Sequence, residues 1–215
     1  MVVDKKELIS VYQEIKGRIE KRLLEFKSVW RREREDEIFS ELVFCILTPA
    51  ARARSAGECL ECLEKRNLLM NGGVEDISEE LRLVRFKNNK ARNIVEARKC
   101  FCTNGKVHIR GVIAQAGNNN RKREWLVSSV RGMGYKEASH FLRNIGFYED
   151  LAILDRHILK NLKAFGLIEH IPESLTRKRY LSLEETMKEL AVDLEIPLSH
   201  LDFLLWYRET GDIFK

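Results

Sequence analysis

Proline and glycine are scarce in this sequence, and long apolar runs are absent. Only 3 prolines and 12 glycines occur among 215 residues, whereas charged residues make up 33% of the chain. Both scarce residues weaken helices, so the composition favours a helix-rich protein. No apolar run approaches the roughly 20 residues of a membrane span. The start, Met1–Lys6, carries no cleavable signal peptide. We therefore expect a cytoplasmic protein with no membrane partner.

Cysteine is also infrequent. An odd count in a cytosolic chain argues against a disulfide framework. Two close pairs could in principle supply a four-thiolate metal site. Both pairs lie in helical patterns, however, where cysteine commonly acts as a small buried apolar residue. We therefore expect no metal site from these side chains. The five cysteines are Cys45, Cys59, Cys62, Cys100 and Cys102.

The size and charge of the chain permit several kinds of partner. A chain of 215 residues suits one domain or two small ones with a sizeable core. Its apolar content of 44% is that of a globular protein, and its net charge is +5. A mild basic excess fits an anionic partner, although a charged face is more often simply solvated. Charge alone therefore does not identify the partner.

Apolar residues recur at helical spacing along most of the chain. The sequence predicts helices at residues 5–26, 38–47, 50–69, 85–102, 156–165, 180–194 and 198–207. Ser78 is expected to cap a further short helix, and an Asn of the turn at residues 117–120 to cap one that opens with the basic segment Arg121–Arg123. Positive charge at a helix start opposes the helix dipole, so a phosphate near this segment would explain it, and a tolerated surface cluster is the alternative. Only residues 106–111 could form a strand.

A glycine turn separates two helical segments in the second half of the chain. Gly132 and Gly134 flank Met133, which should anchor the turn in the core. Glycine has no Cβ to obstruct a sharp turn between helices. The free backbone N–H groups at the start of the second helix can bind a phosphate without reading a base. The pattern predicts a helix-hairpin-helix at about residues 121–146, a module that grips the DNA backbone. The second helix has one apolar face, formed by Ala138, Phe141, Leu142 and Ile145.

Two residues near the hairpin extend this motif. Lys136 lies in the first turn of the second helix, and Asp155 follows 19 residues later. Three segments, GMGYKEASHFLRN (132–144), LAILDRHILKNL (151–162) and LDFLLWYRETGDIFK (201–215), resemble the helix-hairpin-helix DNA glycosylase superfamily. The resemblance is closest to the archaeal-type 8-oxoguanine DNA glycosylase/AP lyases and covers nearly the whole chain. Bifunctional members carry a Lys and an Asp at this separation.

The resemblance implies a prokaryotic, DNA-associated repair enzyme. It would excise 8-oxoguanine by attack of the Lys136 amine on the sugar C1′, then cleave the strand by β-elimination through a Schiff base. The start of a helix and a buried pocket would both favour the neutral amine. Asp155 would stabilise the oxocarbenium-like sugar or move protons. Asp155 could also cap the helix that starts at Arg156, and both roles can coexist.

The resemblance also implies an all-α, two-lobed fold with a DNA-binding cleft between the lobes. Residues 36–147 would form a six-helix barrel-like lobe that carries the hairpin, and residues 1–35 with 148–215 the second lobe. The protein would be a monomer that binds double-stranded DNA containing 8-oxoguanine, with no organic cofactor. Similar proteins can hold a monovalent cation at the hairpin carbonyls. Some relatives carry an iron–sulfur cluster on cysteines after the catalytic Asp, but this chain has no Cys after Cys102, so that cluster is absent.

Further DNA contacts follow from the resemblance. His157 would donate to a phosphate, unless it is a structural histidine. The terminal Lys215 would contact the oxidised guanine, and Trp206 would line the same pocket, unless it is a core residue. Phe86 is the candidate wedge that enters the base stack, and a packed core Phe is the alternative. Relatives often place a gap-filling Asn or Gln where this chain has Ala50–Ala51, so the gap-filling residue is unassigned.

Two other functions fit the same motifs. A glycosylase/lyase for another lesion, such as an oxidised pyrimidine or a mismatch, would keep Lys136 and Asp155, because lesion choice depends on pocket side chains. A non-catalytic DNA-binding module would keep the hairpin but would need neither residue. The presence of both therefore counts against the binding module.

Overall fold

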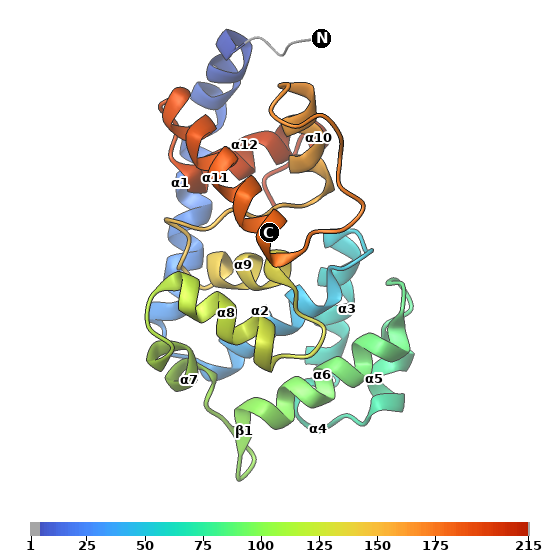
Figure 1. Cartoon of the computed structure of the whole chain (residues 1–215). Helices are drawn as coiled ribbons and strands as arrows, with labels where there is room; N and C mark the ends of the chain where they lie inside the picture. The colour runs from blue at the N-terminus through green and yellow to red at the C-terminus, as the bar shows by residue number, and fades with distance from the viewer. Residues whose placement is uncertain (1–4, 215) are drawn as a thin grey trace.

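The computed structural model describes residues 5–214. Across this range the chain forms twelve helices and one two-stranded sheet, so the predicted all-α class is confirmed. No helix within it is long and apolar enough to cross a membrane. One group of helices comprises α2 (Glu35–Leu47), α3 (Ala53–Lys65), α4 (Leu68–Asn71), α5 (Val74–Glu80), α6 (Lys87–Phe101), α7 (Ile109–Gln115), α8 (Asn119–Ser129) and α9 (Tyr135–Asn144). The other comprises α1 (Lys5–Arg31), α10 (Arg156–Ala164), α11 (Arg177–Asp193) and α12 (Leu198–Thr210), and lies above the first in Figure 1. Strands β1 (Cys102–Thr103) and β2 (Lys106–Val107) pair antiparallel.

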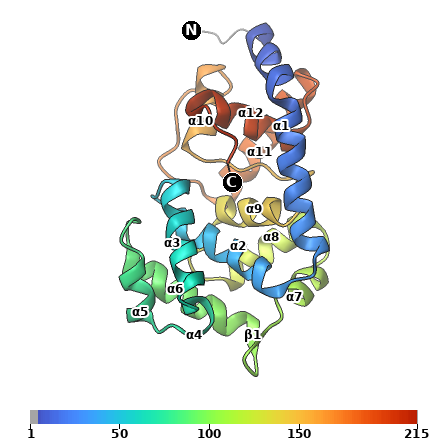
Figure 2. The ribbon, with the colours of Figure 1, turned by 180° about the vertical axis from the view of Figure 1, so that it is seen from behind.

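Each group of helices has its own hydrophobic core. The first core draws on residues from Val29 to Leu151, including the predicted apolar face of α9. The second combines one face of α1, up to Phe26, with residues from Ala152 onward. The chain therefore crosses from the second core to the first near the end of α1, and returns after Leu151. Helix α1 runs along the side of both groups (Figure 2).

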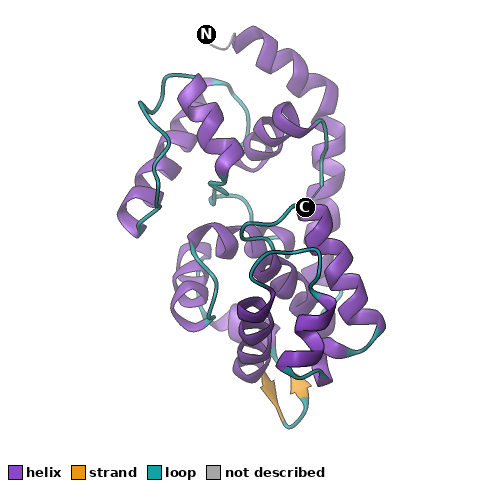
Figure 3. Cartoon of the chain, turned by 90° about the vertical axis from the view of Figure 1, so that its right-hand side faces the viewer, coloured by secondary structure: helices purple, strands orange, loops and turns teal. Residues whose placement is uncertain are grey.

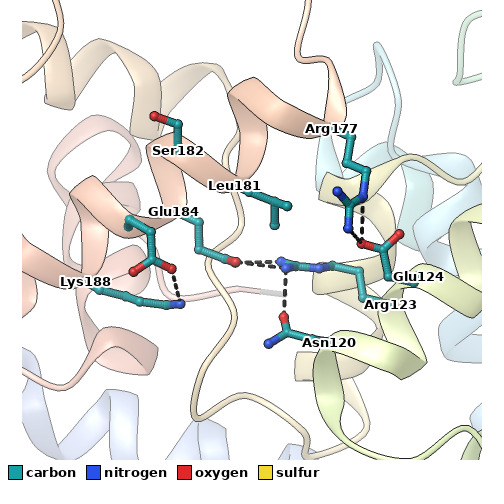
Figure 4. A pocket seen from close by; sticks show the side chains of 9 residues that line it. Asn120, Arg123, Glu124, Arg177, Leu181, Ser182, Glu184 and Lys188 are labelled. Carbon is teal, nitrogen blue, oxygen red and sulfur yellow. Dashed lines mark hydrogen bonds and ion pairs between the residues drawn. The ribbon is translucent and has the colours of Figure 1, made fainter.

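Buried ion pairs join the two groups. Arg123 of α8 binds Glu184 of α11 at 2.6 Å, and the two side chains are 1% and 2% exposed. Figure 4 shows this pair beside a surface pocket between the helices. The backbone N–H of Ala152 also donates to Glu184. Arg143 of α9 donates to Asp202 of α12 at 3.0 Å. Removing one partner would leave a buried charge unpaired, so these pairs hold the two groups in one arrangement.

The prediction that Ser78 caps a helix is wrong. Helix α5 begins earlier, at Val74, and Gly73 precedes it in an extended conformation. The carboxylate of Asp76 accepts a hydrogen bond from the Gly73 N–H at 2.9 Å. Ser78 lies inside the helix and donates to Asn88 of α6 at 2.6 Å. A glycine start with an acidic side chain three residues later thus replaces the expected serine cap.

The predicted asparagine cap of α8 is Asn118, whose side-chain oxygen accepts from the Arg121 N–H at 3.0 Å. The phosphate interpretation of the basic segment is wrong for two of its members. Lys122 and Arg123 are buried. Lys122 donates to the Gly117 carbonyl and lies 4.7 Å from the ring centroid of Phe147, while Arg123 binds Glu184. The cationic side chains of Lys122 and Arg123 are therefore both bound by groups of the protein itself.

Candidate active site

The hairpin between α8 and α9 depends on its first glycine. Gly132 has a φ of +84°, and a Cβ added there would lie 2.1 Å from the Asn93 side-chain nitrogen of α6. Gly134 has an ordinary φ of −97°, and its N–H donates to Glu137 Oε2 at 3.1 Å. Met133 is 5% exposed, so its predicted role as the anchor of the turn is confirmed. Both the backbone conformation and the lack of space therefore require a glycine at position 132. At position 134 both constraints are weaker.

Lys136 lies in the first turn of α9, where its amine meets the end of α2. The Nζ atom is 2.9 Å from Glu137 Oε1 and 3.2 Å from Thr48 Oγ1. The side chain is 22% exposed, so it is neither fully buried nor freely solvated. Both partners accept hydrogen bonds, so they hold the amine through its N–H groups and leave the lone pair of the neutral amine free.

Asp155 caps α10, which confirms that predicted role. Its Oδ1 atom accepts from the backbone N–H groups of His157 and Ile158 at 2.8 and 2.9 Å. Burial raises the pKa of the Asp155 carboxyl, while the Ile158 N–H and the positive charges of His157 and Lys136 act in the opposite direction. The carboxyl is therefore desolvated and lies close enough to Lys136 to feel its charge.

An aromatic pair lies next to Asp155. The rings of His157 and Trp206 are edge to face, with centroids 4.7 Å apart. The His157 Nδ1 atom is 3.6 Å from Glu209 Oε2. Trp206 is half-buried, so it is not a fully buried core side chain. The two rings join α10 to α12 at one edge of the site.

The C-terminal segment returns to the first group of helices, at the level where the two groups meet (Figure 3). Asp212 binds Arg54 of α3 at 2.5 Å. The Phe214 ring packs against Phe44 of α2, with centroids 6.4 Å apart. Lys215 lies outside the described residues. The segment that precedes it thus bridges the two groups beside α2 and α3.

Phe86 is an exposed residue at the start of α6. Its side chain is 61% exposed and its φ is +59°, a left-handed conformation uncommon for a bulky residue. The Arg85 guanidinium lies 5.6 Å from its ring centroid. The core alternative for Phe86 is therefore wrong. Ala50 in the loop after α2 is exposed as well and has a φ of +52°.

The structure brings together residues that are far apart in the sequence. Lys136 of α9 interacts electrostatically with Asp155, and His157, two residues after Asp155, packs on Trp206 of α12. Phe86 instead lies exposed in the turn before α6. Thr48 and Glu137 were not predicted as neighbours of the amine, although the third position of α9 could have identified Glu137 as a partner for the helix start. Across residues 5–214 no three His, Cys, Asp or Glu side chains are grouped so as to hold a metal ion.

Comparisons with known sequences agree on one family. A family model described as 8-oxoguanine DNA glycosylase matches residues 19–196. The 8-oxoguanine DNA glycosylase/AP lyase of Fusobacterium nucleatum is 44% identical over 209 residues, which cover 97% of this chain and 96% of that protein. The protein of the same name from Korarchaeum cryptofilum is 42% identical over 205 residues, covering 92% and 90% of the two chains.

Solved structures are similar over almost the whole chain. The 8-oxoguanine DNA glycosylase of Thermotoga maritima has a TM-score of 0.87 and 37% identity, covering 98% of both chains. The Methanocaldococcus jannaschii 8-oxoguanine glycosylase/lyase, in complex with a 15mer DNA containing 8-oxoguanine, has a TM-score of 0.86 and 35% identity, covering 97% of this chain and 100% of that one. The predicted two-lobed helix-hairpin-helix glycosylase fold is confirmed.

Proposed function

The chain belongs to the 8-oxoguanine DNA glycosylase family, and from this premise we propose that it excises 8-oxoguanine from double-stranded DNA and then cleaves the strand. The observation that carries the proposal is the electrostatic interaction between the Lys136 amine in the first turn of α9 and the buried Asp155 carboxyl at the start of α10. An amine and a desolvated carboxyl are the two groups that Schiff-base glycosylase chemistry needs.

Base excision begins when the damaged nucleotide leaves the base stack. The neutral Lys136 amine attacks C1′ and the bond between C1′ and the base breaks, so the base departs with the electron pair and takes up a proton. The sugar carries developing positive charge at this stage. The ionised Asp155 carboxyl stabilises that charge, and burial makes the interaction stronger than it would be in water.

Strand cleavage follows from the covalent bond to Lys136. The C1′–O4′ bond of the attached sugar then breaks, one proton passes from the nitrogen to O4′, and a protonated Schiff base forms between the nitrogen and C1′. The iminium makes the C2′ hydrogen acidic, and its removal expels the 3′ phosphate by β-elimination. Water then hydrolyses the Schiff base and releases Lys136. An amine and a carboxyl complete this sequence, so we propose that no organic cofactor takes part.

We propose that further DNA contacts lie around Lys136 and Asp155. The hairpin at Gly132 and Gly134 binds a backbone phosphate. The Gly134 N–H is bonded to Glu137 in the free protein, so a phosphate at this atom would displace that carboxylate. His157 contacts a second phosphate, and Phe86 enters the base stack. A monovalent cation at the hairpin would have backbone carbonyl oxygens as ligands, a donor type that suits hard cations.

We propose that the extruded base lies between the two groups of helices. Trp206 stacks on it or lines its pocket, and Lys215 contacts it from the end of the chain. The position of Phe214 on α2 supports this, because it brings the C-terminal segment back towards the lobe that carries Lys136. We further propose that the protein acts in the cytoplasm as a monomer.

Borohydride trapping tests the proposed function. Wild-type protein would be incubated with a duplex carrying one 8-oxoguanine, with undamaged and thymine-glycol duplexes alongside. A covalent adduct on 8-oxoguanine alone supports substrate and mechanism together. An adduct only on thymine glycol would assign the protein to oxidised-pyrimidine repair. No adduct on any duplex, with DNA binding intact, would refute the lyase mechanism.

A further inference from the structure

A second lysine is buried beside the site. Lys90 of α6 is 4% exposed, yet it has no carboxylate partner among the ion pairs formed within residues 5–214. Its Nζ atom donates instead to the carbonyl oxygens of Leu47 and Pro49, at 2.8 Å each. A buried ammonium is unfavourable unless its hydrogen bonds are satisfied, so this placement calls for a specific explanation.

The two carbonyls that Lys90 binds flank the residue that contacts Lys136. Leu47 ends α2, where backbone carbonyls lack helical partners and carry partial negative charge. Between Leu47 and Pro49, Thr48 donates its hydroxyl hydrogen to the Cys45 carbonyl at 2.9 Å. The Thr48 oxygen in turn accepts from Lys136 at 3.2 Å. Two lysines from different helices therefore hold one short turn.

Lys90 constrains the orientation of that turn. Its two hydrogen bonds fix the peptide units before and after Thr48–Pro49, and the Ala51 N–H holds the Thr48 carbonyl at 3.1 Å. The following residue, Ala50, has a left-handed φ of +52°, which an alanine adopts only under constraint. With Lys90 removed, one buried and one partly buried carbonyl would lose their partner and this turn would be free to relax.

The charges around the two amines are few and identifiable. Lys90 faces the Cys59 thiol from α3 and Lys136 from α9, and burial together with the charge of Lys136 lowers the pKa of Lys90 to about 8. Lys136 faces Glu137, which pairs with it, and Asp155. The repulsion between the two amines therefore makes Lys90 easier to deprotonate than an exposed lysine.

We propose that Lys90 is a positioning residue for the nucleophile: it holds the turn that presents Thr48 to the Lys136 amine, and so fixes where that amine lies. The inference rests on the proposed function. Lys90 itself touches neither the sugar nor the base. Its effect is exerted through the 47–50 turn.

Three variants separate this role from a contribution to stability. Lys90→Met removes the charge and both hydrogen bonds but keeps a long apolar side chain, and Lys90→Arg keeps a permanent charge and the donors. Lys99→Met, an exposed change on the same helix, is the control. Each would be assayed by single-turnover borohydride trapping on a saturating duplex with one abasic site, from about pH 6 to about pH 10. Thermal unfolding and DNA affinity would be measured in parallel.

For Lys90→Met we expect trapping to slow by roughly 10- to 100-fold near neutral pH, with unchanged DNA affinity. The loss should be of similar size across the pH range, because the substitution changes the position of the amine. Lys90→Arg should restore most of the rate, since it keeps the donors to the turn, and Lys99→Met should match wild type. A Lys90→Met rate that falls only in proportion to the folded fraction, or a Lys90→Arg rate no higher than that of Lys90→Met, would overturn the inference. A failure of wild-type protein to form any adduct would instead overturn the proposed function, and the inference with it.

Discussion

Gly132 of the hairpin lies against the side-chain amide of Asn93 on α6. The gap is so narrow that a Cβ at position 132 would come within 2.1 Å of the Asn93 nitrogen. The left-handed φ of +84° at the same residue is itself unfavourable for a residue with a side chain. The hairpin thus touches α6, the helix that also carries Lys90. The position of the hairpin relative to the first core therefore depends on the absence of a Cβ at residue 132.

Substitution of the two hairpin glycines should therefore have unequal effects. Gly132→Ala combines backbone strain with a steric clash and should lower the free energy of unfolding by about 1–3 kcal/mol. Gly134→Ala meets only the flexible Glu137 carboxylate, at 3.1 Å, and should lower it by less. Urea unfolding of both variants measures the difference. Equal destabilisation of the two variants would contradict a specific steric role for the contact between residue 132 and Asn93.

Asp155 has two roles that substitutions can separate. Asp155→Asn keeps a good helix cap but removes the charge, so stability should change little while single-turnover excision falls by roughly 100- to 10,000-fold. Asp155→Ala should lose activity and also about 1 kcal/mol of stability. Excision kinetics and thermal unfolding distinguish these outcomes. An Asp155→Asn variant with wild-type excision would limit Asp155 to a structural role.

Phe86 should matter for DNA binding and not for folding. The ring is 61% exposed, so Phe86→Ala should alter stability by less than about 0.5 kcal/mol. Loss of stacking in the duplex should weaken affinity for lesion-containing DNA by about 1–3 kcal/mol. Val192→Ala, at a 79% exposed position on α11, is the control. Titration of both variants with labelled duplex tests the prediction, and equal affinities would contradict a wedge role.

Removal of the last residue should affect lesion recognition alone. Deletion of Lys215 should reduce 8-oxoguanine excision while cleavage at a preformed abasic site continues, because the lyase step needs Lys136 but no base contact. Parallel assays on the two duplexes give the ratio of the two rates. An equal loss of both activities would point to a role in folding or in general DNA binding.

Asp202 should give the protein a distinctive pH dependence. Burial raises the pKa of this carboxyl to about 6, against the opposing effect of Arg143. The folded state therefore binds the Asp202 proton more tightly than the unfolded state does. This contribution to stability is complete below about pH 4 and is lost as pH rises through 6, with a total of about 3 kcal/mol. Urea unfolding at several pH values should show that Asp202→Asn removes this component, and an unchanged profile would contradict the assignment.

Regular apolar spacing predicted much of the fold. The positions Ala138, Phe141, Leu142 and Ile145 are all 0% exposed, as the helical period requires. Helix ends were harder to predict. The predicted helix at residues 50–69 divides into α3 and α4, with Asn67 left-handed between them. Such breaks depend on tertiary contacts, which periodicity does not contain.

Polar side chains of the site were predicted unevenly. Lys136 and Asp155 belong to a motif with a fixed separation, so the resemblance identified them. Lys90 lies in the polar segment 87–90, which reads as a solvated helix start, because its partners are carbonyls more than 40 positions away. Arg123 was predicted to lie near a phosphate because positive charge at a helix start opposes the helix dipole, and its actual partner, Glu184, is 61 positions away. A single sequence does not reveal which charges are neutralised across the fold.

Helix α1 is separated in sequence from the helices that it packs against, and this separation sets the order in which the two cores can form during synthesis. The first core is nearly continuous in sequence, from Val29 to Leu151, so its helices can pack as soon as α9 has left the ribosome. The apolar face of α1 is made earlier but waits for residues beyond Ala152. At roughly 5–20 residues per second this wait lasts on the order of ten seconds. The newly made chain therefore exposes the apolar face of α1 until its last third emerges. We expect chaperones that bind exposed apolar segments to bind α1 during this time.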